Sequence, residues 1–320
     1  MQTASAQGHS NNKSRFIVWV ALSANVAIAS AKLFAALVTG SSAMLAEAAH
    51  SFADSGNEVS LLLGLRLAAR APDASHPFGY GMERYFWTFM ASIFMFIVGG
   101  SFSVFQGVSR LLSPQELEQI GISYAVLGIA AVFDGISFSL AFRGLKAQLA
   151  GSGLWTTLRR TKDPTLFIVL LEDSAALIGL ALAFMGLLLY QWTGSAVFGA
   201  IASVLIGLLL GIVAMCLGLE SRSLLLGEAA APEIQNNIRC AVMHLPEVTG
   251  IVEMLTMHLA PEEILVVMDL NLQDNFTTDQ IEMTLDHVEN EVRRVVPQAT
   301  RIYIECEPLR QVRRSRRIQP

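Results

Sequence analysis

The feature that most constrains this sequence is a stretch from Ser174 to Leu219 that contains no charged residue. A helix crosses the ~30 Å hydrocarbon core of a bilayer with ~20 apolar residues, so this stretch is long enough for two crossings. The residues Gln191–Ser195 (Q-W-T-G-S) interrupt it as a turn. The stretch therefore predicts two membrane-spanning helices joined by a short loop.

Composition extends this prediction to most of the chain. Only 15% of the 320 residues are charged, whereas soluble domains carry about 25%. The charges are sparse between Phe16 and Leu219 and crowd the region after Glu220. We therefore predict a flexible N-terminus (1–14) and an all-α transmembrane domain over 15–220, whose six spans lie near 15–39, 43–68, 85–111, 120–142, 165–190 and 195–218.

Lys and Arg residues collect in the loops on one side of the predicted spans, and this bias places both termini in the cytoplasm. The first residues lack the apolar segment of a secretory signal, so we expect no cleaved signal peptide. We expect a multi-pass protein of the bacterial inner membrane; an organelle membrane, with the termini in the matrix, is the alternative. The residues that carry the bias are Lys13, Arg15, Arg66, Arg70, Arg84, Arg143, Lys146, Arg159, Arg160 and Lys162.

The residues after Glu220 predict a small soluble domain over 228–308. Apolar spacing alternates between the helical and the strand period, and Thr277 and Pro297 suit the start and end of a helix. We predict a cytoplasmic α+β domain in the order αββαβ, which is ferredoxin-like. Its elements lie near 232–245, 250–258, 263–272, 278–296 and 300–306. The basic tail (309–320) is either disordered or in contact with anionic lipid headgroups.

A polar stripe marks the second predicted span. Glu47, His50, Asp54 and Glu58 are three or four residues apart, so they share one face of a helix. Ionisable residues inside a membrane are costly and are therefore candidate functional residues. His50 and Asp54 lie one turn apart and can point at a single ion. The alternative for His50 is a hydrogen bond between helices.

Two further carboxylates fall at a similar depth. With a rise of ~1.5 Å per residue, Asp173 and Asp134 lie near the level of Asp54 in the middle of the membrane. Like charges there repel unless they are protonated or bind a cation. The stripe therefore predicts a site for a divalent ion that competes with protons. Imidazole and carboxylate suit Zn²⁺ and Co²⁺ and also accept Mn²⁺ or Fe²⁺.

We predict His50, Asp54 and Asp173 as the metal ligands of this transport site. Candidate additional ligands are Glu172, Asp134 and Asn25. Asp134 has an alternative, which is to pair with Asn25 or Lys32 instead. Glu172 follows Asp173 by one residue and so points ~100° away around the helix axis, as an outer group or as a partner of a neighbouring helix.

Two segments carry a resemblance to a known family. The segment Ala46–Asn57 (A-E-A-A-H-S-F-A-D-S-G-N) resembles the second-span motif of the cation diffusion facilitators, and His76–Arg84 resembles the loop motif that follows it. The likeness covers almost the whole chain. It implies a homodimeric metal/proton antiporter that moves Zn²⁺ or related ions out of the cytoplasm. The soluble domains of such proteins meet at the dimer two-fold axis and often bind metal.

The chain departs from the family pattern in its fifth span. The family usually has a His or Asp four residues before the aspartate, but Val169 stands there before Asp173. The segment Asp163–Asp173 looks like the branch that includes a mitochondrial zinc transporter of animals. The departure leaves His50, Asp54 and Asp173, with Glu172, Asp134 or water completing the shell.

The resemblance also implies two candidate metal sites outside the membrane. In the loop, Asp73 and His76 match positions that bind metal in some members, whereas Tyr80 replaces a histidine. In the soluble domain, Asp269, Glu305 and Glu307 occupy ligand positions of some members. The three histidines of that domain are either further ligands or solvated surface residues: His244, His258 and His287.

The sequence thus predicts a secondary transporter that exports divalent transition-metal cations by alternating access, with Zn²⁺ favoured and no permanently bound cofactor. Its expected partners are metal ions, protons, membrane lipids and a second copy of the chain, and not nucleic acid. The alternative is a family member that has lost transport and serves as a metal-sensing or docking protein. No H-E-x-x-H motif or nucleophile–base pair is evident, so we do not expect an enzyme.

Overall fold

A computed structural model describes residues 22–23, 25–149 and 164–306. The predicted N-terminus (1–14) and basic tail (309–320) lie outside these residues, as do the side chains of 164–169. The chain divides into two compact units, which we describe separately. The first comprises Met1–Leu67, Phe86–Leu154 and Pro164–Ser221, and the second comprises Ala68–Tyr85, Trp155–Asp163 and Arg222–Pro320.

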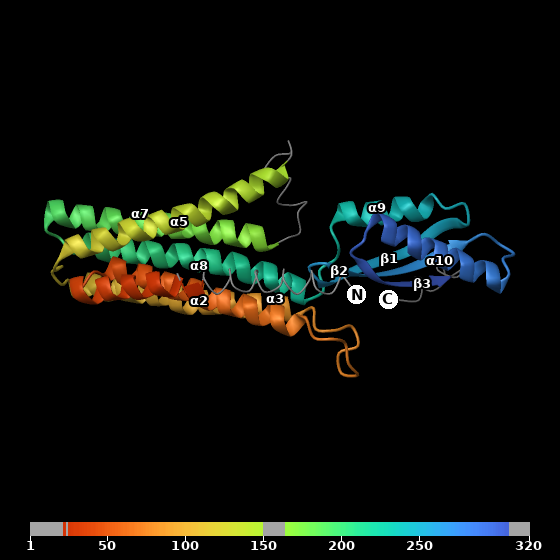
Figure 1. The fold of residues 1–320 in the computed structure, drawn as a ribbon, viewed down its shortest axis with the longest axis horizontal. Helices are drawn as coiled ribbons and strands as arrows, with labels where there is room; N and C mark the ends of the chain where they lie inside the picture. Colours follow the sequence, from red (N-terminus) through yellow and green to blue (C-terminus); the bar gives the residue numbers. More distant parts are fainter. Residues whose placement is uncertain (1–21, 24, 150–163, 307–320) are drawn as a thin grey trace, which may run out of the picture. The chain divides into compact units, whose positions relative to one another are not determined.

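The first unit is a bundle of long helices (Figure 1). An N-terminal helix (Asn25–Thr39) is followed, after Gly40 in the left-handed conformation, by α2. The third span contains a π-helical segment, η1, between two α-helices. The remaining bounds are α2 Ser42–Ala68, α3 Glu83–Phe94, η1 Met95–Ser101, α4 Phe102–Leu112, α5 Ile120–Leu149, α7 Pro164–Thr193 and α8 Val197–Leu225.

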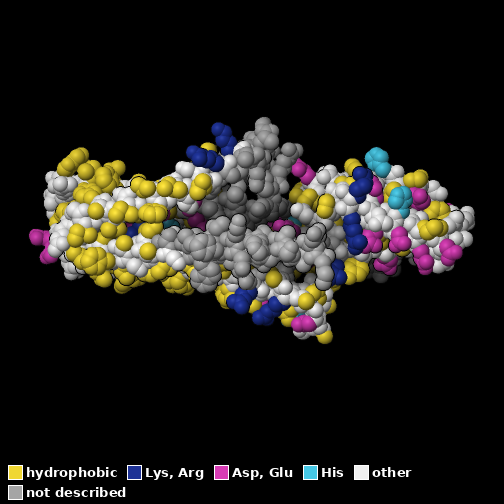
Figure 2. Space-filling view, in the orientation of Figure 1, with side chains coloured by type: hydrophobic (Ala, Val, Ile, Leu, Met, Phe, Trp, Pro, Cys, Tyr) yellow, Lys and Arg dark blue, Asp and Glu magenta, His cyan; other side chains and the backbone are white. Residues whose placement is uncertain are grey.

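The helices of this unit make the chain a multi-pass membrane protein. Within the described residues, four helices are long and apolar enough to cross a bilayer: Glu83–Leu112, Ile120–Leu140, Leu170–Thr193 and Val197–Leu225. The helix α2 is as long but carries its polar stripe, and the N-terminal helix is described only in part. Hydrophobic side chains cover the visible face of this unit (Figure 2), as expected for contact with lipid tails.

Three helices run further than the sequence predicts. We expected the fourth, fifth and sixth spans to end near residues 142, 190 and 218, but α5 continues to Leu149, α7 to Thr193 and α8 to Leu225. The predicted turn at Gln191–Ser195 therefore begins only after Thr193. The added turns include Arg143, Lys146 and Arg222, which are strong helix formers. Hydropathy marks where the apolar stretch ends, and the helix continues beyond that point.

Glycines bring the third and sixth spans into backbone contact. A Cβ atom on Gly207 of α8 would lie 2.6 Å from the Val104 amide nitrogen and 2.7 Å from the Gly100 carbonyl oxygen. On the facing helix, a Cβ atom on Gly107 would lie 2.8 Å from the Ala200 carbonyl oxygen. Small residues allow such close packing in membranes, where helices associate by van der Waals contact.

The second unit confirms the predicted order of elements. It consists of α9 (Pro232–Met243), β1 (Val248–Ala260), β2 (Glu263–Leu272), α10 (Thr278–Val295) and β3 (Ala299–Cys306). The sheet order is β1-β2-β3, with β1 antiparallel and β3 parallel to β2.

A single core holds this unit together. Alternate residues of β2 (Ile264, Val266, Met268 and Leu270) are buried and pack with Ile238, Val242, Val288 and Val292 of the two helices. Thr277 caps α10 as predicted: its hydroxyl accepts from the Gln280 backbone amide. The Gln280 side chain in turn accepts from the Thr277 amide, which completes a capping box.

Candidate metal site

The polar stripe of α2 lies inside the helical bundle. Glu47 and His50 are 0% and 1% exposed, and Asp54 is 25% exposed. Glu58 is half-buried and lies one turn further along. Exposure therefore rises from Glu47 towards Asp54, so the stripe leads from the buried centre of the unit towards a more accessible region.

The predicted pair His50 and Asp54 is brought together. The His50 Nδ1 atom lies 3.3 Å from the Asp54 Oδ1 atom. Both ring nitrogens of His50 and Oδ1 of Asp54 are nevertheless buried without a hydrogen bond to any described residue. Buried polar atoms are normally satisfied, so these atoms need a partner other than the residues that the structure describes. Their donor types are those of a borderline divalent metal.

The two carboxylates of α7 point at different neighbours. Asn57 of α2 donates a hydrogen bond to Glu172 Oε1 over 2.5 Å. Ser137 of α5 donates to Asp173 Oδ2 over 2.9 Å. Glu172 is also close enough for its charge to act on Asp54. Of the two, it is Glu172 that α7 presents to α2, although we predicted Asp173 as the ligand and Glu172 as an additional one.

Asp134 and Asn25 have partners of their own. Asp134 Oδ2 lies 4.0 Å from the Nζ atom of Lys32, which agrees with the alternative that Asp134 pairs with this lysine. The Asn25 side chain donates to Glu58 Oε1 over 2.6 Å and does not meet Asp134 in a described hydrogen bond. Both residues thus line the polar interior without reaching the His50–Asp54 pair directly.

The structure does not close a complete ligand shell. Among the described residues, no three His, Cys, Asp or Glu side chains lie close enough together to hold a metal ion. The Val169 backbone belongs to α7, while its side chain lies outside what the structure describes. The assignment of His50, Asp54 and Asp173 as a ligand set stays a prediction.

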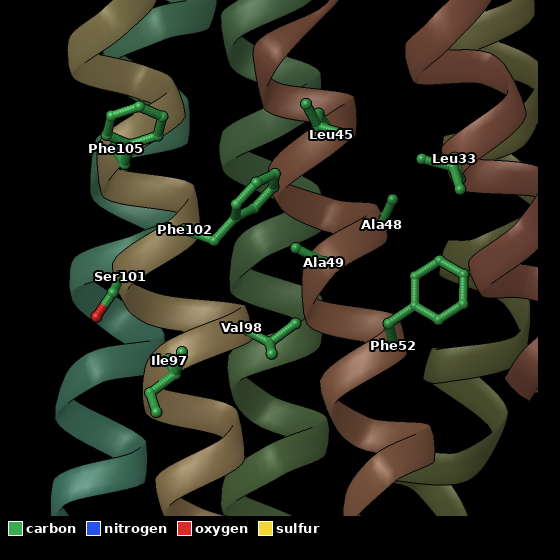
Figure 3. Close-up of a pocket in the computed structure, with 10 residues that line it drawn as sticks. All are labelled: Leu33, Leu45, Ala48, Ala49, Phe52, Ile97, Val98, Ser101, Phe102 and Phe105. Atoms are coloured by element: carbon green, nitrogen blue, oxygen red, sulfur yellow. The ribbon is translucent and has the colours of Figure 1, made fainter.

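An apolar groove of this unit has no part in the site. It measures about 550 Å³ and lies between α2 and the η1–α4 segment (Figure 3). Its lining includes Leu45, Ala48 and Phe52 of α2 and Phe102 and Phe105 of α4. These side chains cannot replace the hydration shell of an ion. One face of α2 is therefore apolar and the opposite face carries the ionisable stripe.

The loop residues form a hydrogen-bonded turn. Asp73 Oδ1 accepts from the Ser75 hydroxyl (2.7 Å) and the His76 amide (2.8 Å), and Oδ2 accepts from the Tyr80 hydroxyl (2.7 Å). The bonds from Ser75 and Tyr80, and then from the His76 amide, hold the pKa of the Asp73 carboxyl well below its usual range. The bond to Asp73 raises the pKa of Tyr80. Both Asp73 oxygens are thus engaged by the loop itself.

The candidate residues of the C-terminal unit separate into two groups. Asp269 pairs in register with Glu305 of β3 and with Glu253 of β1, so three carboxylates form one row across the sheet. Glu253 is absent from our prediction, because strand register cannot be read from single residues. Glu307 lies outside the described residues.

His258 is placed away from this row. It is 2% exposed and pairs with Ile264, a core residue of β2, at the other end of the strand. Because side chains alternate along a strand, Ile264 and Asp269 face opposite sides of the sheet. The expectation that His258 is a solvated surface residue is therefore wrong, because its strand position turns it towards the core. His244 and His287 are exposed.

Sequence reasoning missed the partners of the α7 carboxylates, Asn57 and Ser137. Both are uncharged polar residues three residues from a candidate carboxylate, Asp54 or Asp134, and that proximity was the available signal. Their roles as hydrogen-bond donors follow only from the way in which the helices face one another.

Two models of one protein family match the chain. The cation efflux transmembrane domain matches residues 18–226. The cytoplasmic domain of cation efflux proteins matches residues 230–309. The boundary between the two matches falls at the end of α8, where the helical unit gives way to α9.

Three curated relatives illustrate the range of similar proteins. The mouse mitochondrial proton-coupled zinc antiporter SLC30A9 is 32% identical over 219 residues, which cover 68% of this chain and 39% of the relative. Metal tolerance protein C4 of Arabidopsis thaliana is 34% identical over 216 residues, which cover 66% of this chain and 47% of the relative. The cation-efflux pump FieF of Escherichia coli is 26% identical over 269 residues, covering 83% of each chain. This chain thus spans less than half the length of the mouse and plant relatives.

Proposed function

Because this chain belongs to the cation efflux family, as its motifs predicted, we propose that it exports divalent transition-metal ions from the cytoplasm in exchange for protons. Zn²⁺ is the favoured substrate, and Mn²⁺, Co²⁺ and Fe²⁺ are further candidates. The mouse relative is a proton-coupled zinc antiporter, which agrees with this class of substrate, and the bacterial relative is a cation-efflux pump, which agrees with this direction.

The observation that carries the proposal is the buried pair of His50 and Asp54. An imidazole and a carboxylate one helical turn apart, without hydrogen bonds to described residues, form half of a tetrahedral or octahedral site. In the proposed site, α7 adds the carboxylates of Glu172 and Asp173. A divalent ion would replace the repulsion among these groups by attraction.

Protons and metal compete for the same atoms. A metal ligand must be deprotonated, so binding of the ion releases protons from the imidazole and the carboxylates. In the proposed cycle, the ion enters from the cytoplasmic side and displaces these protons. The helices then expose the site to the opposite side, the ion leaves, and protons from that side reload His50, Asp54 and the α7 carboxylates.

The loop charges, the C-terminal domain and the relatives support proposals for the orientation, the oligomeric state and the host membrane of the protein. The Lys and Arg bias of the loops supports a cytoplasmic location of both termini. The match to the cytoplasmic domain model supports a homodimer through the C-terminal unit. We propose the bacterial inner membrane as the host membrane, with an organelle membrane as the alternative that the mitochondrial relatives suggest.

The direct test is metal-dependent flux in proteoliposomes that contain the full chain. Replacing Asp54 by Ala should abolish Zn²⁺ uptake and the coupled proton movement, whereas Glu116→Ala, which removes an exposed loop carboxylate, should leave both unchanged. Unaltered flux in the Asp54→Ala protein would overturn the assignment of this site.

A second candidate function rests on the absence of a ligand at Val169. A site with too few ligands could bind metal without moving it, and the chain would then act as a metal-sensing or docking protein. Wild-type protein that binds Zn²⁺ but shows no metal-dependent proton flux would favour this function over transport.

A further inference from the structure

A lysine lies buried at the centre of the helical unit. Lys32 of the N-terminal helix is 1% exposed, and its Nζ atom contacts two other helices. In the described part of these helices, the other Lys and Arg residues lie at helix ends or beyond the apolar spans: Arg66, Arg84, Arg110, Arg143, Lys146 and Arg222. A buried ammonium group is costly in a membrane, so its presence needs a reason.

The ammonium group is held unequally by two carboxylates. It donates to Glu47 Oε2 over 3.0 Å and to the Ser51 hydroxyl over 2.9 Å, both on α2. Asp134 Oδ2 of α5 lies 4.0 Å away, which is beyond hydrogen-bond distance but within range of a strong ionic attraction. Lys32 therefore forms a hydrogen bond with one carboxylate, Glu47, and a longer ionic contact with a second, Asp134.

This arrangement adjoins the candidate metal site. Glu47 precedes His50 by three residues, so the two share a face of α2, and Ser51 follows His50 directly. The charge of Lys32 also acts on His50 and Asp54. One oxygen of Glu47, Oε1, remains buried without a hydrogen bond to any described residue. Any change at Lys32 or Glu47 must therefore change the electrostatic field at the metal ligands.

We propose that Lys32 is a tethered counter-ion of the transport site, whose positive charge is shared by Glu47 and Asp134 and limits how tightly the site holds a divalent ion. The inference deepens the proposed function and rests on it. A fixed positive charge lowers the negative field of a site rich in carboxylates. A divalent ion still binds against it, a monovalent ion gains too little attraction, and the bound divalent ion can leave again.

Lys32 and Glu47 carry opposite charges, so removing one charge or the other should change Zn²⁺ affinity in opposite directions. Removing the lysine charge leaves the site more negative, so Lys32→Gln should tighten Zn²⁺ binding. Removing the glutamate charge leaves the lysine uncompensated, so Glu47→Gln should weaken it. Each shift should be at least tenfold, as expected for a unit charge within about 10 Å of a divalent ion at the effective dielectric of a protein interior. The double variant removes both charges and should return to within about threefold of the wild-type Kd.

The experiment is calorimetric titration of Zn²⁺ into the purified full chain in detergent, with Lys32→Arg as the control that keeps the charge. Opposite shifts in the single variants, and recovery in the double variant, are the expected result. A merely structural pair would weaken binding in both single variants without recovery in the double variant, and that result would overturn the proposal. Thermal unfolding shows which variants are folded. If Lys32→Gln does not fold, Asp134→Asn provides the test. This variant also leaves the lysine charge without a compensating carboxylate, so it should weaken Zn²⁺ binding. Tighter Zn²⁺ binding by Asp134→Asn would contradict the proposal.

Measuring metal-dependent proton flux separates the counter-ion role of Lys32 from the transport function on which it rests. Wild-type protein without metal-dependent proton flux would overturn transport, while the opposite shifts in Kd would still establish Lys32 as a counter-ion of a binding site. Wild-type flux with shifts of the same sign in both single variants would overturn the counter-ion and leave transport intact.

Discussion

Asn57 of α2 donates a hydrogen bond to Glu172 of α7 over 2.5 Å. Through this contact, Glu172 is the carboxylate of the Glu172–Asp173 pair that forms a hydrogen bond with α2. Asp173 instead accepts from Ser137 of α5. Adjacent helical residues point ~100° apart, so the two cannot face α2 equally.

We expect Glu172→Gln to weaken Zn²⁺ binding more than Asp173→Asn does. Glu172 acts on Asp54 directly, and its loss should lower affinity by at least the ~10-fold that removal of a supporting partner costs. Calorimetric titration of the full chain in detergent measures both variants, with Glu116→Gln as a control. An equal or larger effect of Asp173→Asn would return the ligand role to Asp173.

Val169→His should shift metal preference towards Zn²⁺ and Co²⁺ and away from Mn²⁺. The change places an imidazole one turn before Asp173, and imidazole favours the borderline metals whereas carboxylates favour Mn²⁺. A competition series of metals in the proton-coupled flux assay measures the ratio. Val169→Leu is the matched control, since it changes size without adding a ligand. An unchanged metal order would show that this position lies outside the site.

Tyr80→Phe should raise the pKa of Asp73 towards the ordinary value of ~3.9. The variant removes the hydroxyl bond to Asp73 Oδ2 and keeps the ring that stacks near His76. A depressed pKa means that the turn is stabilised above the ordinary pKa and loses this stabilisation as pH falls through the lowered one. The carboxyl carbon resonance of Asp73, followed by NMR through acid pH, reports the change. Tyr303→Phe, on β3, is the control.

Gly207→Ala should destabilise the helical unit by about 1–3 kcal/mol, the usual cost of overpacking. The added Cβ atom meets the backbone of Gly100 and Val104, which cannot rotate away as a side chain would. Gly128→Ala is the matched control, because a Cβ atom there meets nothing within 4 Å. Thermal unfolding in detergent compares the two. A Tm for Gly207→Ala equal to that of Gly128→Ala would show that the helices separate at no cost.

The sequence predicted those elements whose signals are local. As predicted, Thr277 caps the start of α10, and the helix ends just before Pro297. The spacing of His50 and Asp54 correctly placed both on one helical face, because the α-helical period leaves little choice. The order of strands and helices in the C-terminal unit followed from the change in apolar period.

Features that depend on packing could not be predicted in this way. The rotation of α7 about its axis decides between Glu172 and Asp173, and only contacts with α2 and α5 fix it. The π-helical segment η1 lies in an apolar stretch whose composition suits an α-helix equally well. The burial of His258 depends on which side of the sheet the helices cover, which no property of the residue itself reveals.

The contact between Lys32 and Glu47 also bears on biosynthesis. Each charged residue at the centre of a helix opposes insertion by about 2.5–3.5 kcal/mol, so α2, with several, is a poor substrate for entry into the bilayer on its own. Only the short turn at Gly40 separates it from the N-terminal helix that carries the compensating ammonium group. The two helices are therefore expected to leave the translocon as a paired hairpin. Lys32 and Glu47, which we propose act at the ion site, would then also favour integration of the nascent chain into the membrane.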